Sequence, residues 1–356
     1  MGFVAGTLVP RGRGTRHRGR RHLATASGVS RQQQVAARRP ALIRTAVIGV
    51  GYLGRFHAQK YASLPNSQLV GIADPAAAAR AAVAAELKVA AHADYRDLLG
   101  QVDAVSIVTP TPTHFEVAKA FLEAGASVLV EKPMTVTIAE GEGLIEIAAR
   151  RKRILQVGHL ERFNAAVLAV QPTLTVPRFI ESARLAPFKH RGTDVDVVLD
   201  LMIHDIDLIL SIVRSPVVSV DAIGSSVFSK EIDIANARLR FANGCVANAT
   251  ASRVSLKTER KLRLFQDDAY LSLDLQQKIL TVIRKGEGVG LDGMPQVAID
   301  EKTYEQGDAL KSEIEAFLAA VANGQPPPVT GEDGLLALRT AVSIGEQVAS
   351  SMQKFS

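Results

Sequence analysis

The fold is decided by residues 43–54, which read IRTAVIGVGYLG. The first half is a short apolar run with the length of a buried strand, and the second half places glycine at positions 49, 51 and 54. The pattern predicts a strand over Arg44–Val50, a tight turn, and a helix from about Leu53 to Leu64. Such a turn brings a phosphate close to the start of the helix, where the first N–H groups are unpaired.

The glycines and a later acidic residue predict a dinucleotide site. Gly49 permits the turn, Gly51 lets the main chain approach a pyrophosphate, and Gly54 lets the helix pack closely on the strand. Asp74 ends a second predicted strand and lies 20 residues after Gly54, where a carboxylate accepts hydrogen bonds from a ribose hydroxyl and repels a 2′-phosphate. We therefore expect NAD rather than NADP as the cofactor, although Asp74 can also be interpreted as a turn residue before a proline.

Strands and helices alternate up to about residue 157, which indicates a parallel sheet covered on both faces. After about Phe163, strand-like runs follow one another, and Asn243-Gly244 between two of them is typical of a tight hairpin turn. We expect residues 44–165 to form the dinucleotide-binding domain and residues 166–356 to form a substrate-binding and oligomerisation domain. The helices expected in the second part are Val195–Val213, Asp308–Ala322 and Glu332–Ser351.

The basic character of the chain is concentrated at its start. The net charge is +6, yet residues 1–44 hold ten arginines and no lysine, aspartate or glutamate, which leaves −4 for the rest. We expect residues 1–43 to be a disordered, Arg-rich extension, although a transit peptide or an arm for nucleic acid or membranes has a similar composition. The apolar runs elsewhere are too short to span a bilayer, and the single Cys245 excludes an intramolecular disulfide. We expect a cytoplasmic protein with no nucleic-acid or membrane partner.

Polar turns follow two neighbouring strands of the expected parallel sheet. Residues 109–114 read TPTPTH, and residues 131–133 read EKP; each stretch comes directly after a buried apolar run. Because ligands of open parallel sheets bind beyond the carboxyl ends of the strands, both turns should face one crevice. Further along the chain, Asp200 and His204 lie four residues apart and would share one face of the long helix.

In this combination and order, the motifs resemble those of the Gfo/Idh/MocA oxidoreductase family over residues 44–354. The resemblance implies a Rossmann domain followed by an α/β domain with an open, mainly antiparallel sheet, whose face joins subunits into a homodimer or homotetramer. It also implies that Lys132, Asp200 and His204 line the place where the substrate meets the nicotinamide. The residues then expected to bind the cofactor are Gly49, Gly51, Tyr52, Leu53, Gly54, Asp74, Thr109, Pro110, His114 and Glu131.

The three expected catalytic residues fit the oxidation of an alcohol. A base must take the hydroxyl proton while hydride leaves the carbon, and His204 suits that role because histidine titrates near neutrality. Lys132 can stabilise charge on the substrate oxygen, or be the base itself if its pKa is lowered, and Asp200 can orient His204 or bind a substrate hydroxyl. A helix-cap network or salt bridges between domains would also explain these residues, and a metal site lacks a convincing third ligand.

Residues 158–164, 184–191 and 194–204 read GHLERFN, RLAPFKHR and DVDVVLDLMIH. They resemble the corresponding stretches of family members that oxidise UDP-N-acetylglucosamine at C3, a step toward a diamino sugar of lipid A. A diphosphate needs cationic partners, and arginine suits phosphate well. The residues expected to bind substrate are Arg162, Asn164, Arg184 and Arg191. Two alternatives stay open: a dehydrogenase of a free polyol such as an inositol, which needs no phosphate contacts, and a non-catalytic sensor that binds dinucleotide, which needs no proton acceptor.

Overall fold

The first half of the chain is built on a six-stranded parallel sheet. The structure is a computed structural model that describes residues 42–188, 195–289, 295–304 and 307–353, so the predicted extension over residues 1–43 lies almost wholly outside the described residues. The strands lie in the order β3-β2-β1-β4-β5-β6, and each neighbouring pair is parallel. Their bounds are β1 (Ile43–Ile48), β2 (Ser67–Ala73), β3 (Ala90–His92), β4 (Ala104–Ile107), β5 (Ser127–Glu131) and β6 (Leu155–Gly158).

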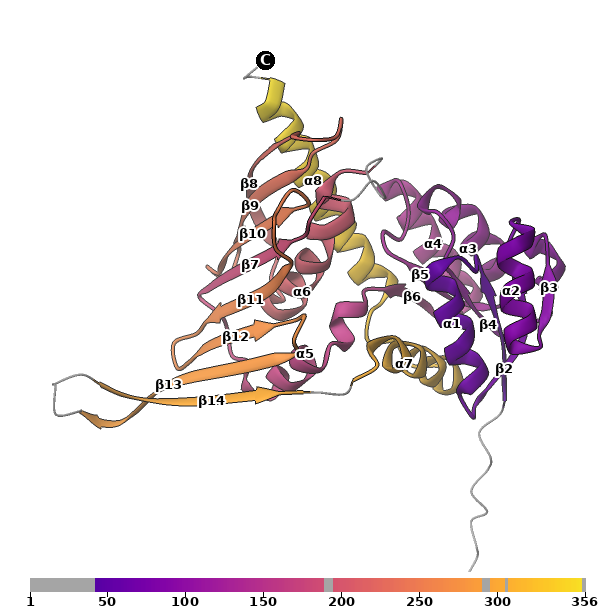
Figure 1. Ribbon diagram of the computed structural model, residues 1–356, viewed down its shortest axis with the longest axis horizontal. Coiled ribbons are helices and arrows are strands. Elements are labelled where there is room, and N and C mark those ends of the chain that lie inside the picture. Colours follow the sequence, from indigo (N-terminus) through magenta and orange to yellow (C-terminus); the bar gives the residue numbers. More distant parts are fainter. Residues whose placement is uncertain (1–41, 189–194, 290–294, 305–306, 354–356) are drawn as a thin grey trace, which may run out of the picture. The chain divides into compact units, whose positions relative to one another are not determined.

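Helices cover both faces of this sheet (Figure 1). On one face, α1 (Tyr52–Ser63), α2 (Ala77–Leu87) and α7 (Ala309–Asn323) share an apolar core with the strands. On the other face, α3 (His114–Glu123) and α4 (Ile138–Arg151) do the same. The central strands are buried along almost their whole length, as strands covered on two faces must be. The strand order and the covering helices confirm the predicted Rossmann-type fold.

Helix α7 reaches this core from far along the chain. Its Ile314, Phe317 and Leu318 are fully buried and belong to the same apolar cluster as Tyr61 of α1. An ion pair fixes the start of the helix, because Lys60 Nζ lies 2.5 Å from Asp308 Oδ2. The C-terminal part of the chain thus completes the N-terminal core, and the domain boundary at residue 165 stays a prediction.

The second half forms an eight-stranded sheet in the order β14-β13-β12-β11-β7-β10-β9-β8, in which all neighbours are antiparallel except β7 and β10. Side chains alternate along the strands, so that Leu262 and Leu264 are buried while Arg263 is half-exposed. The buried face packs on α6 (Ile203–Val213) and α8 (Gly331–Gln353). The remaining bounds are α5 (Ala165–Val170), β7 (Phe179–Leu185), β8 (Val217–Ser225), β9 (Ile234–Phe241), β10 (Val246–Ser252), β11 (Glu259–Phe265), β12 (Tyr270–Asp274), β13 (Ile279–Val289) and β14 (Pro295–Thr303).

The sequence pattern does not predict the β13–β14 hairpin. Residues 284–288 read RKGEG, which carries none of the alternation of a half-buried strand. In β14, Val297 and Ile299 are 61% and 63% exposed, so their apolar character does not mark a buried face. An edge hairpin of this kind is held mainly by main-chain pairing with β12, a contact that the local sequence does not reveal.

The helix predicted over Val195–Val213 is less regular than expected. A π-helical turn, Val198–Met202, precedes α6. Asp196 caps the start of this turn, because its Oδ1 accepts hydrogen bonds from the N–H groups of Val198 and Leu199 at 2.8 and 2.9 Å. The change of helix type falls between Asp200 and His204, so the segment predicted as one helix is not α-helical throughout, and the shared face of this pair stays a prediction. Such π-turns are frequent at functional sites.

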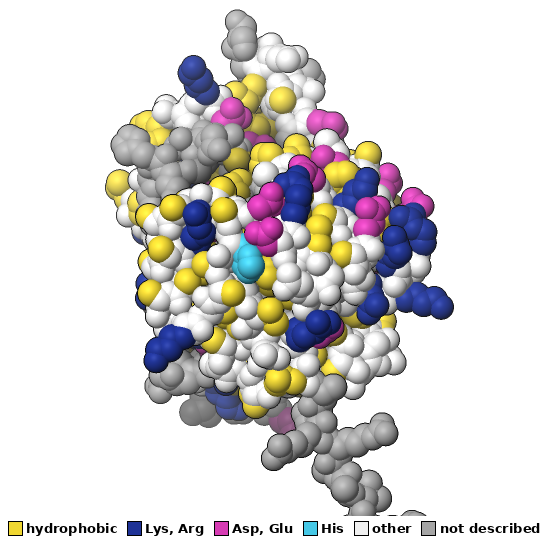
Figure 2. Space-filling model, turned by 90° about the vertical axis from the view of Figure 1, so that its right-hand side faces the viewer, with side chains coloured by type: hydrophobic (Ala, Val, Ile, Leu, Met, Phe, Trp, Pro, Cys, Tyr) yellow, Lys and Arg dark blue, Asp and Glu magenta, His cyan; other side chains and the backbone are white. Residues whose placement is uncertain are grey.

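On the face shown in Figure 2, basic and acidic side chains are intermingled rather than gathered by sign. Among the helices within the described residues, none combines the length and the apolar character that a membrane span requires.

Candidate active site

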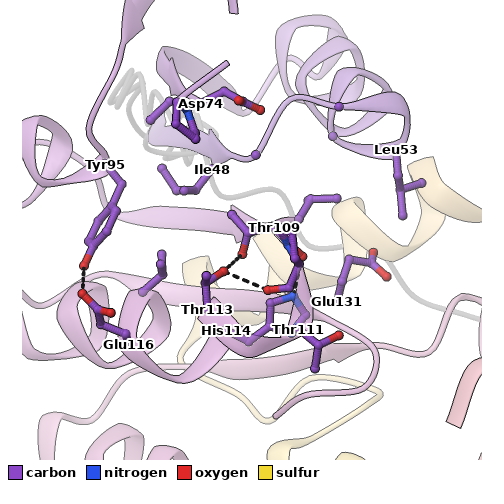
Figure 3. Close-up of a pocket in the computed structure, with 18 of the residues that line it drawn as sticks. Ile48, Leu53, Asp74, Tyr95, Thr109, Thr111, Thr113, His114, Glu116 and Glu131 are labelled. Atoms are coloured by element: carbon purple, nitrogen blue, oxygen red, sulfur yellow. Dashed lines mark hydrogen bonds between the residues drawn. The ribbon is translucent and has the colours of Figure 1, made fainter. Parts of the chain in front are cut away.

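A cavity of about 910 Å³ lies beyond the carboxyl ends of β1, β2, β4 and β5. Each of the ten residues predicted to bind the cofactor lines it, and so does Lys132. Figure 3 shows Thr109, Thr113 and His114 grouped together, with Glu131 beside them and Asp74 farther away. The wall of the cavity also includes Tyr95 and Arg96, two residues that no sequence motif indicated. The Arg96 guanidinium stacks on the Tyr95 ring, 4.7 Å from the ring centroid.

The glycine turn fits a bound pyrophosphate. Gly49 has a φ of +82°, which side chains rarely tolerate, and a Cβ on Gly54 would lie 1.8 Å from the Gly49 carbonyl oxygen. By contrast, a Cβ on Gly51 would meet nothing within 4 Å, so the main chain there borders open space of the cavity. The turn is therefore both obligatory for packing and open toward a ligand, and α1 begins at its end.

Asp74 ties the glycine turn to the end of β2. Its Oδ2 accepts the N–H of Val50 at 2.8 Å, and its Oδ1 accepts the N–H of Ala76 at 2.8 Å. Each carboxylate oxygen has a second lone pair that can accept a ribose hydroxyl. Arg80 does not neutralise this carboxylate, because its Nη1 donates to the main-chain oxygens of Asp74 and Pro75. The arrangement fits NAD better than a 2′-phosphate.

His114 joins the two polar turns. Its Nδ1 lies 3.0 Å from the Pro133 carbonyl oxygen, and its Nε2 lies 2.8 Å from the Thr109 carbonyl oxygen. Burial lowers the pKa of His114, although the two carbonyl groups oppose this effect. The side chain thus holds the turn after β4 against the turn after β5, and the Lys132–Pro133 peptide bond within the latter is cis.

Lys132 and Asp200 come together from the two halves of the chain. Lys132 Nζ donates a hydrogen bond to the Asp200 main-chain oxygen at 2.7 Å and lies 3.6 Å from Asp200 Oδ1. The Lys132 side chain is 18% exposed, whereas that of Asp200 is 41% exposed. Burial lowers the pKa of Lys132, while Asp200 and Glu131 act in the opposite direction. The ammonium group is therefore held at the inner end of the cavity beside a more accessible carboxylate.

His204 lies in a cationic environment. Burial is the largest cause that lowers its pKa well below the ordinary value, and the charges of Lys132 and Arg184 act in the same direction. Its Nδ1 is buried and forms no hydrogen bond with any part of the chain that the structure describes. A neutral imidazole with unused hydrogen-bonding capacity can accept a proton.

Two of the arginines predicted to bind substrate, Arg162 and Arg184, are paired with carboxylates. Arg162 makes two hydrogen bonds of 2.7 Å to Asp207. Arg184 makes two of 2.9 Å to Asp205 and a third of 3.0 Å to Glu161, and its side chain is only 4% exposed. The hydrogen bonds of both guanidinium groups are thus made to carboxylates of the protein. This favours a role in holding the surrounding residues in place over direct contact with a phosphate.

Asn164 is similarly engaged. Its Nδ2 donates to the Leu275 carbonyl oxygen at 2.8 Å, and its Oδ1 accepts the N–H of Ala166 at the start of α5. Arg191 lies outside the described residues. Direct substrate contacts of Arg162, Asn164, Arg184 and Arg191 stay predictions.

Arg260 is a cation that the sequence motifs missed. It pairs with Arg184 across β11 and β7, its side chain is 48% exposed, and its Nη1 lies 3.6 Å from Glu161 Oε1. Its charge contributes to the low pKa of His204, although burial is the larger cause. The alternation of side chains along a strand could have revealed it. Arg260 lies two and four residues before Leu262 and Leu264 and so shares their helix-facing side of β11, where a cation is unexpected.

Comparisons with known proteins agree with this geometry. Residues 43–159 match the family model described as oxidoreductase family, NAD-binding Rossmann fold, and residues 170–272 match the GFO/IDH/MocA C-terminal domain. A UDP-N-acetylglucosamine 3-dehydrogenase of Acidithiobacillus ferrooxidans is 42% identical over 313 residues, or 88% of this chain and 99% of that protein.

A solved structure of the A. ferrooxidans UDP-N-acetylglucosamine 3-dehydrogenase has a TM-score of 0.82 with this chain at 42% identity, covering 86% of this chain and 98% of the other. An inositol 2-dehydrogenase of Rhizobium meliloti is 25% identical over 328 residues, or 87% of this chain and 98% of that protein. With both domains matched and the NAD-type cavity in place, the chain belongs to the Gfo/Idh/MocA family of NAD-dependent oxidoreductases, which act on CH–OH groups.

Proposed function

We propose that this enzyme oxidises the C3 hydroxyl of UDP-N-acetylglucosamine to a ketone. The observation that carries the proposal is the 42% identity to a UDP-N-acetylglucosamine 3-dehydrogenase across 99% of that protein. The inositol 2-dehydrogenase matches over a similar length at only 25% identity. A shared fold does not decide the substrate, so the local chemistry must agree as well.

The reaction removes a hydride from C3 and a proton from its hydroxyl group, and a C=O bond forms. Bound NAD supplies the hydride acceptor. Neutral His204 accepts the hydroxyl proton, because its low pKa keeps the imidazole uncharged at neutral pH. Lys132 donates a hydrogen bond to the substrate oxygen and stabilises the negative charge that develops there. Asp200 holds the Lys132 ammonium and offers its carboxylate to a neighbouring sugar hydroxyl.

Arg260 is suited to the diphosphate of the substrate. Among the arginines of the described site, Arg162 and Arg184 are largely buried in carboxylate pairs, whereas Arg260 is 48% exposed and only 3.6 Å from a carboxylate that Arg184 already binds. An accessible guanidinium can exchange this weak contact for a phosphate oxygen. A free polyol has no group that requires such a cation.

The wider roles follow from the substrate. The 3-keto sugar nucleotide is a carbonyl compound, which an aminotransferase can convert to an amine on the way to a diamino sugar of lipid A. NAD and sugar nucleotides are metabolites of the cytoplasm, and we propose that the enzyme acts in that compartment. The open face of the eight-stranded sheet, which carries the half-exposed pair Glu181 and Arg263, joins subunits into a homodimer or homotetramer.

A direct assay tests the substrate. The full chain is mixed with NAD and either UDP-N-acetylglucosamine or myo-inositol, and the absorbance of reduced cofactor is followed. A pyridoxal-dependent aminotransferase with an amino donor removes the ketone, so that an unfavourable equilibrium does not hide turnover. Turnover of the sugar nucleotide alone is expected. Turnover of inositol alone would contradict the proposed substrate and leave the oxidoreductase chemistry intact, while measurable NAD binding without any turnover would favour the sensor.

A further inference from the structure

A buried cluster of three titratable side chains lies behind the cofactor cavity. His57 comes from α1, Glu131 from the end of β5, and Glu313 from α7. One ligand-type atom from each lies within 4.8 Å of the others. His57 and Glu313 are fully buried, whereas Glu131 also lines the cofactor cavity next to Lys132. The cluster thus connects the C-terminal helix α7 to the wall of the NAD site.

Most polar side-chain atoms of this cluster lack a hydrogen-bond partner among the described residues. Both carboxyl oxygens of Glu313 and both ring nitrogens of His57 form no hydrogen bond to the described part of the chain. His57 Nε2 lies 3.2 Å from Glu131 Oε1, yet the two groups are not aligned for a hydrogen bond. A buried carboxyl group near a second carboxylate, with no cation paired to it, is favourable only when it carries a proton.

Among the described residues, no lysine or arginine of the elements packed against α7 is paired with Glu313. From α1, the facing titratable groups are His57 and Tyr61, and the Tyr61 hydroxyl is bonded to Ser106. Lys60 pairs with Asp308 instead, and in the Leu160–Phe163 turn that also packs on α7, Glu161 and Arg162 are bonded to Arg184 and Asp207. From β6, Gln156 Nε2 donates to the main-chain oxygen of Glu313. Burial therefore raises the pKa of Glu313 well above its ordinary value, and the charge of Glu131 adds to the effect.

Glu131 is confined on the side that faces β6. A Cβ on Gly158 would lie 2.9 Å from the Glu131 carboxyl carbon, so the neighbouring strand β6 already touches this group. The charge of Glu131 also favours the protonated form of Lys132, the next residue, although burial is the larger influence on that pKa. The position of the Glu131 carboxylate thus matters both for the cavity wall and for the catalytic ammonium.

We propose that Glu313, with His57 beside it, is a positioning residue for the cofactor site. The group is close enough to Glu131, within 4.8 Å, that a protonated Glu313 can turn toward the Glu131 carboxylate and donate a hydrogen bond to it. The proposal concerns the cofactor site and does not depend on which sugar is oxidised. When Glu313 ionises, the donor is lost and two carboxylates face each other, so Glu131 is pushed toward the cavity. NAD affinity then depends on the proton of Glu313, although this side chain is not among the residues that line the cavity.

The test compares the wild type with Glu313→Gln and with a matched control on the same helix, Glu315→Gln, whose side chain is half-exposed. The dissociation constant of NAD is measured by calorimetry at increasing pH. In the wild type and the control, the constant should rise about tenfold per pH unit above the titration of Glu313, because one proton must be bound. Glu313→Gln, which keeps a permanent donor, should abolish this rise, and Glu313→Ala should weaken binding at every pH. Parallel curves for the wild type and Glu313→Gln would overturn the proposal.

A second measurement does not rely on binding. Infrared spectra are recorded at neutral pH on the protein without cofactor, and the spectrum of Glu313→Gln is subtracted from that of the wild type or of Glu315→Gln. Both difference spectra should show the carbonyl band of a protonated carboxylic acid. Absence of this band in the wild type would overturn the proposal. A stoichiometric divalent metal in the purified wild type, lost in Glu313→Gln, would also overturn it and would make the cluster a metal site.

Discussion

Lys132 Nζ lies 2.7 Å from the main-chain oxygen of Asp200, and this hydrogen bond joins the end of β5 to the π-helical turn of the second half of the chain. A side-chain donor from the first sheet and a main-chain acceptor from the second half of the chain hold the Lys132 ammonium in one place. Because the acceptor is main chain, the contact depends on the π-turn rather than on the Asp200 side chain. The site is therefore assembled by the packing of the two sheets and their helices.

Replacing Lys132 by Met should remove the positive charge while keeping much of the side-chain volume. We expect kcat to fall by about 10²–10³-fold, since a donor to the developing oxyanion is lost. NAD affinity should change little, because Gly51 and Asp74, which we expect to bind the phosphate and the ribose, line the same cavity and are unchanged. Steady-state kinetics together with calorimetric titration of NAD separate the two effects. An equal loss of NAD affinity and kcat would contradict the assignment.

Replacing His204 by Asn should lower kcat by about 10²–10⁴-fold if this residue is the base. The pH profile gives an independent check. The folded-state pKa of His204 is lowered well below 6.5, mainly by burial, so the neutral form predominates from about pH 6.5 upward. On the acid side of the profile, we therefore expect kcat/KM to decline only as the pH falls below that value. An acid-side decline that begins above it would instead indicate a different group as the base.

Replacing Arg260 by Gln should raise KM for UDP-N-acetylglucosamine. A hydrogen bond to a charged group contributes about 1.5–3 kcal/mol, which corresponds to a loss in kcat/KM of about 10- to 100-fold. Arg263→Gln is a matched control, because Arg263 lies on the same strand but on its opposite face, paired with Glu181. Equal effects of the two substitutions on kcat/KM would show that Arg260 has no specific contact with the substrate.

Replacing Arg184 by Met should destabilise the fold. Asp205 and Glu161 would then lose the partner that compensates their burial, and breaking a buried pair in this way costs about 3–5 kcal/mol. Chemical denaturation of the variant measures this change. If Arg184 instead binds the diphosphate directly, the stability should stay near that of the wild type while KM rises.

Much of the N-terminal domain can be predicted from its sequence, because local patterns determine it. Apolar runs such as Ala104–Ile107 and the glycine turn depend on neighbouring residues alone, and so does the Asn243-Gly244 hairpin of the second sheet. The paired state of Arg162 and Arg184 cannot be predicted in this way, since their carboxylate partners lie 45 and 21 residues away. The sequence shows which charges exist, whereas the fold decides which of them remain available to a ligand.

The same distinction applies to the segment that carries Asp200 and His204, and to Glu313. The two residues are close in sequence, so their proximity is predictable, but the sequence does not reveal the π-turn over Val198–Met202, which Asp196 caps. Glu313 is one of several acidic residues in an amphipathic helix, and its sequence gives no sign that it is buried. Only the packing of α7 against α1 and β5 distinguishes it from its exposed neighbour Glu315.

The packing of α7 has a consequence for biosynthesis. Leu310, Ile314 and Phe317 belong to the apolar cluster that includes α1 and the parallel sheet, yet they are made long after residues 43–158 have left the ribosome. Until then, the nascent cofactor domain exposes the apolar surface that α7 will cover. The domain cannot reach its native core during translation, so chains that stop before residue 309 should be prone to aggregate and depend on chaperones.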